Sequence, residues 1–381
     1  MALFSPYFVG MNVLDEDWQI LVSMLPPSWQ STARLSGAFE RLRGFDSAHE
    51  LLHVLLMHVG CGYSLRETAV RARAAGLAEV SDVTLLNRLR QSEGWLHHLC
   101  QALLSESGVR WCAPLPRRRL RAVDGTVIKE PGPTGSHWRI HYSLLLPELI
   151  CDQLVITARK GTRRAENLER FPAAPGDLIL ADRGYCHPAG IARVRQQGAD
   201  IIVRLNSSVP LFDVQDKRMP LLPELRRLPA AGSLGQWGLC LHSGAQRVQG
   251  RLCAVRKSQQ AIAVAQRKLD QREHKNQIRV RAETREYAHY VMVFTTLPEA
   301  EMGAAEVLEY YRFRWQIELV FKRLKSLLAV GHLPKHDERS SRAWLYGKLF
   351  VALLTQKLVR LGGSISPWGY ELQAPQGESM A

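Results

Sequence analysis

The chain has 381 residues, which is enough for two or three domains. Its 46% hydrophobic and 23% charged residues are typical of a globular protein and exclude a mainly disordered chain. The 50 lysines and arginines exceed the 36 acidic residues by 14, and this excess favours a polyanionic partner, either nucleic acid or an anionic membrane surface.

The seven cysteines are scattered and never form a Cys-x-x-Cys pair. This spacing argues against a disulfide framework and a cysteine zinc site, and it predicts a reducing, cytoplasmic setting. The N-terminus shows no signal peptide, and the apolar runs are far shorter than the ~20 residues of a membrane span. We therefore expect a soluble, intracellular protein.

Residues 1–112 are predicted to form a helical domain. Ser47-Ala-His-Glu50 and Ser64-Leu-Arg-Glu67 fit the capping-box pattern that begins a helix, and a third helix is expected to begin near Ser81. A helix at 65–75 and another at 82–92, joined by a turn with Gly76, resemble a helix-turn-helix.

That arrangement would place the second helix, which carries Arg88 and Arg90, in a DNA major groove. The alternative is ordinary packing, because any small helical bundle contains such helix pairs.

From residue 113 the pattern changes to strands and helices, which predicts an α/β domain with a mixed sheet flanked by helices. The expected elements are strands at 120–128, 140–146, 150–157, 177–181 and 200–205 and a helix at 188–197.

Proline and glycine interrupt the pattern at 206–289, which we interpret as a basic, partly β insertion into this domain. A strand at 290–296, a long helix at 304–328 and a helix at about 339–361 are expected to follow, with a loosely ordered tail at 363–381. The α/β domain would then comprise 113–205 and 290–362.

The segment 310–325 carries the strongest chemical pattern. On one helix, at about 100° per residue, Tyr311, Arg314, Glu318 and Lys325 share a face. A lone carboxylate there would be surrounded by basic side chains and a phenol. The alternative is an exposed face on which Glu318 pairs with basic residues four positions away.

Two aspartates also follow apolar strands, Asp124 in Val-Asp-Gly-Thr and Asp182 in Ala-Asp-Arg-Gly-Tyr. An acid at this position starts a turn, caps a helix or binds a ligand. Together with Glu318 they form an all-oxygen ligand set that suits a hard cation such as Mg²⁺.

The pattern Tyr311-x2-Arg314-x3-Glu318-x6-Lys325, with Asp124 and Asp182, resembles the DDE-type bacterial insertion-sequence transposases of the insertion-sequence-four family. The resemblance covers roughly residues 45–345. It implies a ribonuclease-H-like core interrupted by a β-rich insertion, and metal-dependent cut-and-paste excision and strand transfer of the element.

The family also implies how the residues are used. Asp124, Asp182 and Glu318 would hold two Mg²⁺ ions, with Mn²⁺ as a substitute, while Arg314, Lys325 and Tyr311 would contact phosphates. The partners would be the terminal inverted repeats and the target DNA, which a homodimer would hold together in a synaptic complex. The protein would be associated with the bacterial nucleoid. The helical domain would bind the DNA ends.

Further DNA contacts are expected from two basic loops and one aromatic side chain. The loops contain Lys129 and Arg139, and Arg163 and Arg164. A base flipped out of the duplex would stack on Trp315, with Trp237 and Tyr290 as the other candidates. Core packing is the alternative for each aromatic ring.

Two other functions are consistent with parts of the sequence. A transposase relative without catalysis would bind DNA as a repressor, although all the signature residues are present. His49-Glu50-x-x-His53 matches the short zinc-peptidase motif, but Glu50 already completes a capping box, so packing of both histidines is the favoured interpretation.

Overall fold

A computed structural model describes residues 18–40, 44–106, 118–131, 137–158, 166–334 and 337–363. The chain divides into two compact units. The helical unit combines 1–108, 129–135 and 324–381, and the sheet unit combines 109–128 and 136–323. The predicted tail therefore lies outside the described residues, apart from its first residue, 363.

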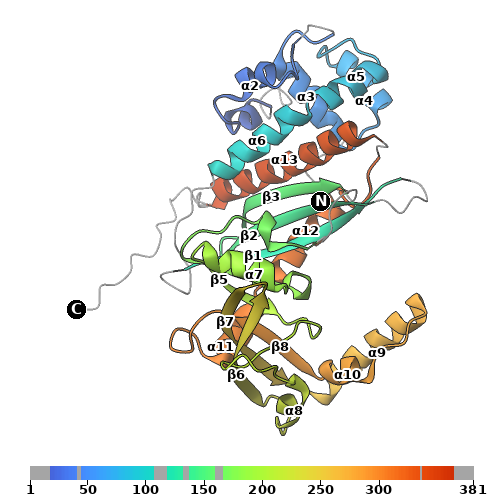
Figure 1. The fold of residues 1–381 in the computed structure, drawn as a ribbon. Coiled ribbons are helices and arrows are strands. Elements are labelled where there is room, and N and C mark those ends of the chain that lie inside the picture. The colour runs from blue at the N-terminus through green and yellow to red at the C-terminus, as the bar shows by residue number, and fades with distance from the viewer. Residues whose placement is uncertain are drawn as a thin grey trace. The chain divides into compact units, whose positions relative to one another are not determined.

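The helical unit begins its helices where the sequence predicts. Its elements are α2 (Trp29–Leu35), α3 (Ala48–Val59), α4 (Leu65–Ala74), α5 (Asp82–Gln91), α6 (Glu93–Ser105) and α13 (Glu338–Gly363) (Figure 1). The side chains of Ser47, Ser64 and Ser81 accept hydrogen bonds from the backbone N–H three residues later, which caps α3, α4 and α5. The predicted helix starts are confirmed.

The core of the helical unit forms where α13 packs against α3, α5 and α6. Trp95 of α6 is fully buried and donates from its indole to the carbonyl of Trp29 at 2.9 Å. A Cβ atom on Gly347 of α13 would lie 3.0 Å from Val59 of α3, so the helices approach too closely there for a larger residue.

The histidines of the zinc-peptidase pattern pack inside this unit. The indole of Trp18 donates to His49 and stacks on the ring of His53, with 4.0 Å between the ring centroids. Glu50 accepts the backbone N–H of Asp46 at 2.7 Å. The preference for packing over a zinc site is thus consistent with the structure.

The sheet unit contains eight described strands in one sheet, in the order β3-β2-β1-β4-β5-β8-β7-β6 (Figure 1). The strands are β1 (Arg119–Lys129), β2 (His137–Leu146), β3 (Ile150–Ala158), β4 (Asp177–Ala181), β5 (Asp200–Arg204), β6 (Leu234–Ser243), β7 (Gln246–Arg256) and β8 (Tyr290–Thr295). The pairs β1–β4 and β4–β5 are parallel, whereas β2–β3, β5–β8, β7–β8 and β6–β7 are antiparallel. The predicted α/β fold with a mixed sheet is confirmed.

Helices pack on this sheet and form most of the segments that connect its strands. They are α7 (Pro188–Gln196), α8 (Leu221–Arg226), α9 (Gln259–Asn276), α10 (Ala282–Tyr287), α11 (Ala304–Arg312) and α12 (Trp315–Leu327), with short 3₁₀ turns at Leu168–Arg170 and Arg183–Tyr185. Ile191 and Val194 of α7 pack with Ile179 and Ile201 in one hydrophobic cluster. The boundary between the two units falls within α12, and its residues from Leu324 onward belong to the helical unit.

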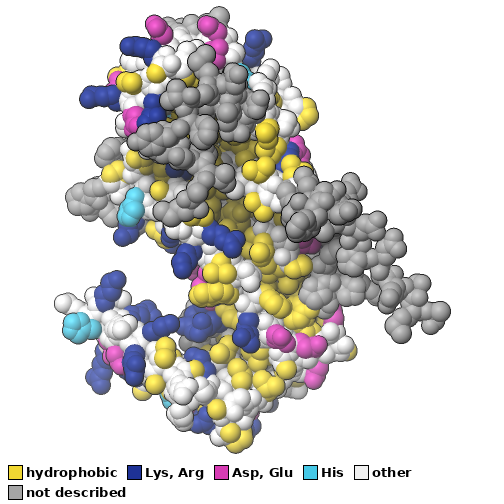
Figure 2. Space-filling view, turned by 180° about the vertical axis from the view of Figure 1, so that it is seen from behind, with side chains coloured by type: hydrophobic (Ala, Val, Ile, Leu, Met, Phe, Trp, Pro, Cys, Tyr) yellow, Lys and Arg dark blue, Asp and Glu magenta, His cyan; other side chains and the backbone are white. Residues whose placement is uncertain are grey.

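The segment predicted as an insertion extends the sheet. Its hairpin β6–β7 pairs through β7 with β8, so the strands at 234–256 continue the sheet that contains β1, β4 and β5. The helix α9 buries none of its residues, so this basic part of the predicted insertion is a solvent-exposed helix. Figure 2 shows Lys and Arg side chains prevailing on the arm of α9 and α10, at the lower left.

The prediction of one long helix at 304–328 was wrong, because the structure has two helices, α11 and α12, on either side of Phe313 and Arg314. The N–H of Arg314 donates to the carbonyl of Tyr311, and Ile317 donates to Arg314, both three residues back. This tight 3₁₀-type bonding replaces the four-residue spacing of an α-helix and breaks the helix at Arg314.

Candidate active site

Two parallel strands place the aspartates side by side. Val123 of β1 is paired with Ala181 of β4, and the next residues along the chain are Asp124, within β1, and Asp182, directly after β4. Neighbouring strands lie about 4.8 Å apart, and residues in register project to the same face. Asp124 does not end its strand as expected, since β1 continues to Lys129. It lies where the pairing with β4 stops.

The break between α11 and α12 brings two signature residues to these aspartates. The hydroxyl of Tyr311, at the end of α11, donates to Oδ1 of Asp182 at 2.9 Å. The Arg314 guanidinium lies 5.6 Å from the Tyr311 ring centroid. Ile317 and Phe321 of α12 are buried and hold this helix in the sheet unit, where Phe321 meets the edge of the Tyr142 ring.

One guanidinium joins two of the predicted acids. Nη2 of Arg314 donates to Oε1 of Glu318 at 2.6 Å, and Nη1 lies 3.7 Å from Oδ2 of Asp124. The Arg314 side chain is only 11% exposed. We call this arrangement the Arg314 bridge. The structure therefore gathers Asp124, Asp182, Tyr311, Arg314 and Glu318 in one place.

The two aspartates differ in acidity. Burial raises the pKa of Asp124 to about 6, and the charges of Asp182 and Glu166 add to this effect, while the N–H of Gly125 and the charge of Arg314 oppose it. Burial also acts on Asp182, but the N–H of Arg183, the charge of Arg314 and the Tyr311 hydroxyl outweigh it and lower its pKa. Asp124 is therefore the weaker acid of the two, chiefly because it is buried with fewer compensating hydrogen bonds.

Asp124 is surrounded by Arg139, which was expected in a basic loop but lies on β2, and by side chains that were not predicted. A Cβ atom on Gly125 would lie 3.3 Å from Arg139, from Nδ1 of His141 and from the Tyr185 hydroxyl, so a larger residue would crowd these three side chains. Arg139 forms a 3.2 Å ion pair with Glu166. Glu166 gave no sequence signal, because it follows no strand and belongs to no recognisable motif.

Two arginines beyond Asp182 were also missed. The charge of Arg204, at the end of β5, acts on both Asp182 and Tyr311. Burial, Arg204 and Arg183 together lower the pKa of Lys257 to about 8. Applying the strand-end rule to basic residues as well as acids would have found Arg183, which follows Asp182, and Arg204, the last residue of β5.

The remaining predicted residues are dispersed. Trp315 is 56% exposed beside Arg314, whereas Trp237 is partly buried and Tyr290 is buried in the hydrophobic cluster. Lys129 and Lys325 are exposed and belong to segments that group with the helical unit. Arg163 and Arg164 lie outside the described residues.

Comparison with known proteins identifies the family. The model of the transposase DDE domain matches residues 115–354. The chain belongs to the DDE transposases. It is 32% identical to the transposase InsL of insertion sequence element IS186A from Escherichia coli strain K12 over 92% of this chain and 96% of that protein. The transposase of insertion sequence element IS421 from Escherichia coli matches with the same identity and shares.

A more distant relative and a solved structure were also found. The transposase of insertion sequence element IS231C from Bacillus thuringiensis is 22% identical over 47% of this chain and 41% of its own length. A cryo-EM structure of the piggyBac transposase synaptic complex with hairpin DNA aligns with 93% of this chain and 75% of its own, at 9% identity and a TM-score of 0.44.

The protein is therefore a DNA transposase, an enzyme that cleaves DNA and transfers strands. Its DDE domain implies dependence on a divalent metal. Among the described residues, no three His, Cys, Asp or Glu side chains are placed to hold a metal ion in their present positions. No helix in the described ranges combines the length and the apolar character that crossing a membrane requires.

Proposed function

We propose that this transposase excises its own insertion element by cutting and rejoining DNA at a site formed by Asp124, Asp182 and Glu318. The observation that carries the proposal is the Arg314 bridge, in which one arginine contacts acids from β1 and α12. Asp124 and Asp182 directly follow the last register pair of β1 and β4, Val123 with Ala181. Asp182 also accepts a hydrogen bond from Tyr311, at the end of α11.

The donor set fits the metal that the family implies. Asp124, Asp182 and Glu318 offer only carboxylate oxygens, which are the ligands that Mg²⁺ prefers. Burial raises the pKa of Asp124, with a smaller contribution from the charges of Asp182 and Glu166, and a bound cation would favour the ionised carboxylate. These three residues would hold two Mg²⁺ ions, with Mn²⁺ as a substitute. When bound, such ions supply activation of the attacking oxygen and stabilisation of the leaving oxygen.

The chain's own basic residues would position the DNA. A guanidinium binds phosphate through two parallel N–H bonds, so Arg314 would grip the backbone near the scissile bond, and Lys325 would add a second positive charge. Lys129, Arg139, Arg163 and Arg164 would contact flanking phosphates. Tyr311 would keep the Asp182 carboxylate oriented, or contact a phosphate if the hydroxyl leaves Asp182.

We also propose that the sheet is a ribonuclease-H-like core and that the chain is a member of the insertion-sequence-four family. The strand order β3-β2-β1-β4-β5, with β1, β4 and β5 parallel, supports this core. The core would comprise 113–205 and 290–362, and the strands at 234–256 would belong to the insertion at 206–289.

Trp315 would hold the base that is flipped out when the DNA end forms a hairpin. Its 56% exposure leaves the indole accessible, whereas Tyr290 is buried and Trp237 packs against the hydrophobic cluster. Stacking on an aromatic ring offsets the cost of unpairing a base.

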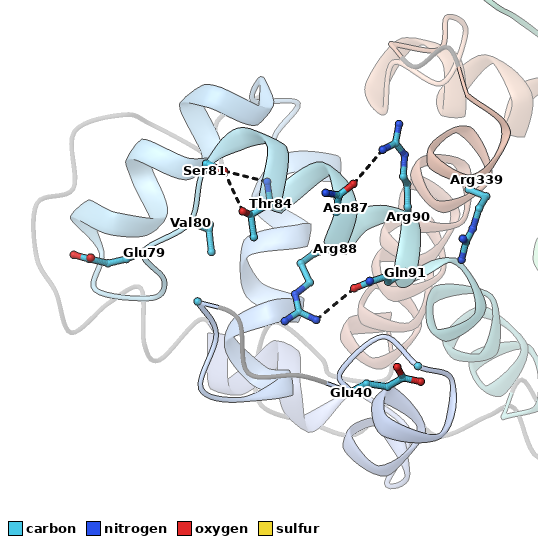
Figure 3. A pocket seen from close by; sticks show the side chains of 12 residues that line it. Glu40, Glu79, Val80, Ser81, Thr84, Asn87, Arg88, Arg90, Gln91 and Arg339 are labelled. Carbon is cyan, nitrogen blue, oxygen red and sulfur yellow. Dashed lines mark hydrogen bonds between the residues drawn. The ribbon is translucent and has the colours of Figure 1, made fainter.

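The helical unit would recognise the ends of the element. A pocket of about 760 Å³ lies along α5, and Figure 3 shows Ser81, Thr84, Asn87 and Gln91 lining it. Hydrogen-bonding side chains on one helix face are the means by which a recognition helix reads base edges.

Arg88 and Arg90, the basic residues predicted on this helix, are poorly placed to contact DNA bases. Arg88 is buried and donates to Gln91, while Arg90 forms a 2.9 Å ion pair with Asp337. Asn87 and Gln91 are exposed on the same helix and are the residues we assign to base contacts.

Two copies of the chain would join the two ends of the element in a synaptic complex, bound to the nucleoid where their DNA lies. The excess of 14 positive charges favours such binding to DNA.

The decisive experiment measures Mg²⁺-dependent cleavage of a duplex that carries the element's own terminal repeats. We expect Glu318→Ala to abolish cleavage while DNA binding survives, and Glu309→Ala, an exposed acid on α11, to cleave like the wild type. Persistent cleavage by Glu318→Ala would refute its assignment. Absence of cleavage by the wild type in Mg²⁺ and in Mn²⁺ would refute the proposed reaction.

A further inference from the structure

The Arg314 guanidinium lies where the proposed metal ligands need a cation. Nη2 is 2.6 Å from Glu318 Oε1 and Nη1 is 3.7 Å from Asp124 Oδ2, so both carboxylates already have a positively charged neighbour. An arginine keeps its proton in proteins, which means that this charge cannot be removed by titration. A divalent ion at the same oxygens would be repelled by the guanidinium.

The Arg314 bridge is also incompletely bonded. Nε and Nη1 are buried and have no hydrogen-bond partner among the described residues, although Nη1 is in ion-pair range of Asp124. Buried donors without an acceptor are unfavourable, so the bridge leaves part of the hydrogen-bonding capacity of Arg314 unused.

A phosphate group offers what the bridge lacks. It accepts two parallel N–H bonds from one guanidinium, and its own negative charge replaces that of the carboxylates. Trp315, the next residue, is exposed, so DNA has access to the chain beside Arg314.

We infer that Arg314 couples DNA binding to metal binding. In the free protein the guanidinium neutralises Asp124 and Glu318 and weakens their affinity for a divalent ion. A DNA phosphate draws the guanidinium away, and the released carboxylates then bind metal. This inference rests on the proposed metal site at Asp124, Asp182 and Glu318.

Coupling of this kind is reciprocal, so metal must tighten DNA binding by the same factor by which DNA tightens metal binding. Couplings between two sites commonly amount to about 5- to 150-fold. The consequence for the transposase is that the metal is bound at the acids chiefly when DNA is in place.

The test measures Mn²⁺ affinity by the electron paramagnetic resonance signal of the free ion, which requires no catalytic turnover. The full chain is titrated alone and with a pre-cleaved duplex that ends at the terminal repeat, and Mn²⁺ bound by the duplex alone is subtracted. We expect the duplex to raise the Mn²⁺ affinity of the wild type at least about 5-fold.

The variant Arg314→Gln should bind Mn²⁺ at least about 5-fold more tightly than the wild type without DNA, and it should lose the effect of the duplex. Arg312→Gln removes the same charge from an exposed site two residues away and should behave as the wild type. Equal Mn²⁺ affinities of Arg314→Gln and the wild type would overturn the inference.

Two further measurements separate the possible failures. Asp182→Asn should bind Mn²⁺ poorly, and if it binds normally, the proposed metal site itself is wrong. Circular dichroism shows whether Arg314→Gln folds. If it does not fold, the wild-type measurement alone tests the inference, because an Mn²⁺ affinity that is unchanged by the duplex would exclude the coupling.

Discussion

The hydroxyl of Tyr311 donates a 2.9 Å hydrogen bond to Oδ1 of Asp182 and so ties the end of α11 to the end of β4. Tyr311 is 9% exposed, and burial followed by the negative charge of Asp182 raises the pKa of its phenol. The hydroxyl therefore remains a donor at neutral pH and fixes the orientation of one carboxylate oxygen.

Replacing Tyr311 by phenylalanine should slow cleavage without unfolding the protein. Hydrogen bonds to charged groups contribute about 1.5–3 kcal/mol, and a loss of about 1.4 kcal/mol of positioning in the transition state corresponds to a tenfold lower rate. Single-turnover cleavage should fall about tenfold or more in Tyr311→Phe. Tyr310→Phe, on the same helix, serves as the control, and an unchanged rate in Tyr311→Phe would show that the bond does not position Asp182 for catalysis.

Much of this site follows from rules of local sequence. Asp124 and Asp182 were found because each follows apolar residues of a predicted strand. The parallel pairing of Val123 with Ala181, which brings the two acids together, was not predicted. The helical face with Tyr311, Arg314 and Glu318 was also visible, because residues three and four apart share a face.

The break in that helix was not visible in the sequence. Two helices joined by a 3₁₀ turn keep nearly the same spacing of apolar residues as one long helix, so periodicity does not distinguish them. The burial of Arg88 could not be predicted from the sequence either. Its burial against Phe45, 6.0 Å from the ring centroid, depends on tertiary contacts that no local pattern encodes.

Asp124 should reduce the stability of the protein at neutral pH. Its pKa is about 6 in the folded protein, above the ordinary value of 3.8. The folded state therefore holds the proton more tightly, and the contribution of Asp124 to stability falls as pH rises from about 4 to 6 and stays low above that range. A difference of about two pKa units corresponds to about 3 kcal/mol, as an upper value.

Asp124→Asn should accordingly raise the free energy of unfolding by about 1–3 kcal/mol at pH 7.5 in the presence of EDTA, with a gain that disappears towards pH 4. Asp182→Asn is the matched control with the opposite sign, since the pKa of Asp182 is lowered by its partners. Denaturant titration of both variants at several pH values measures the effect. A stability gain of Asp124→Asn that is equal at pH 4 and 7.5 would contradict this account.

The sheet unit also depends on a buried arginine of β1. Arg121 is fully buried and forms ion pairs of 2.9 Å with Asp177 and 3.0 Å with Asp152. Arg121→Met would leave Asp177, itself buried, with one partner fewer, and breaking a buried pair from one side costs about 3–5 kcal/mol. We expect the free energy of unfolding, measured by denaturant titration, to fall by about this amount.

Arg247→Met provides the comparison, because Arg247 pairs with Asp216 and both side chains are exposed, at 41% and 49%. An exposed pair contributes little to stability, so this variant should unfold close to the wild-type midpoint. Equal destabilisation by the two variants would indicate that burial of the Arg121 pairs does not determine their importance.

The pocket along α5 is expected to recognise the DNA sequence at the ends of the element. Asn87 and Gln91 are exposed, one turn apart, and line the pocket drawn in Figure 3. Asparagine and glutamine side chains each make paired hydrogen bonds to adenine in the major groove, and one such pair discriminates between bases by about 1–3 kcal/mol. The double variant Asn87→Ala and Gln91→Ala should therefore lose about 10-fold or more of its preference for the terminal repeat over a scrambled duplex. Its binding to the scrambled duplex should persist, because that affinity comes from phosphate contacts and depends on salt.

Competition binding at one fixed salt concentration measures the ratio of the two affinities, with Gln101→Ala, at an exposed position of α6, as the control. If the double variant retains the full preference for the terminal repeat, the ends are read by another surface of the transposase.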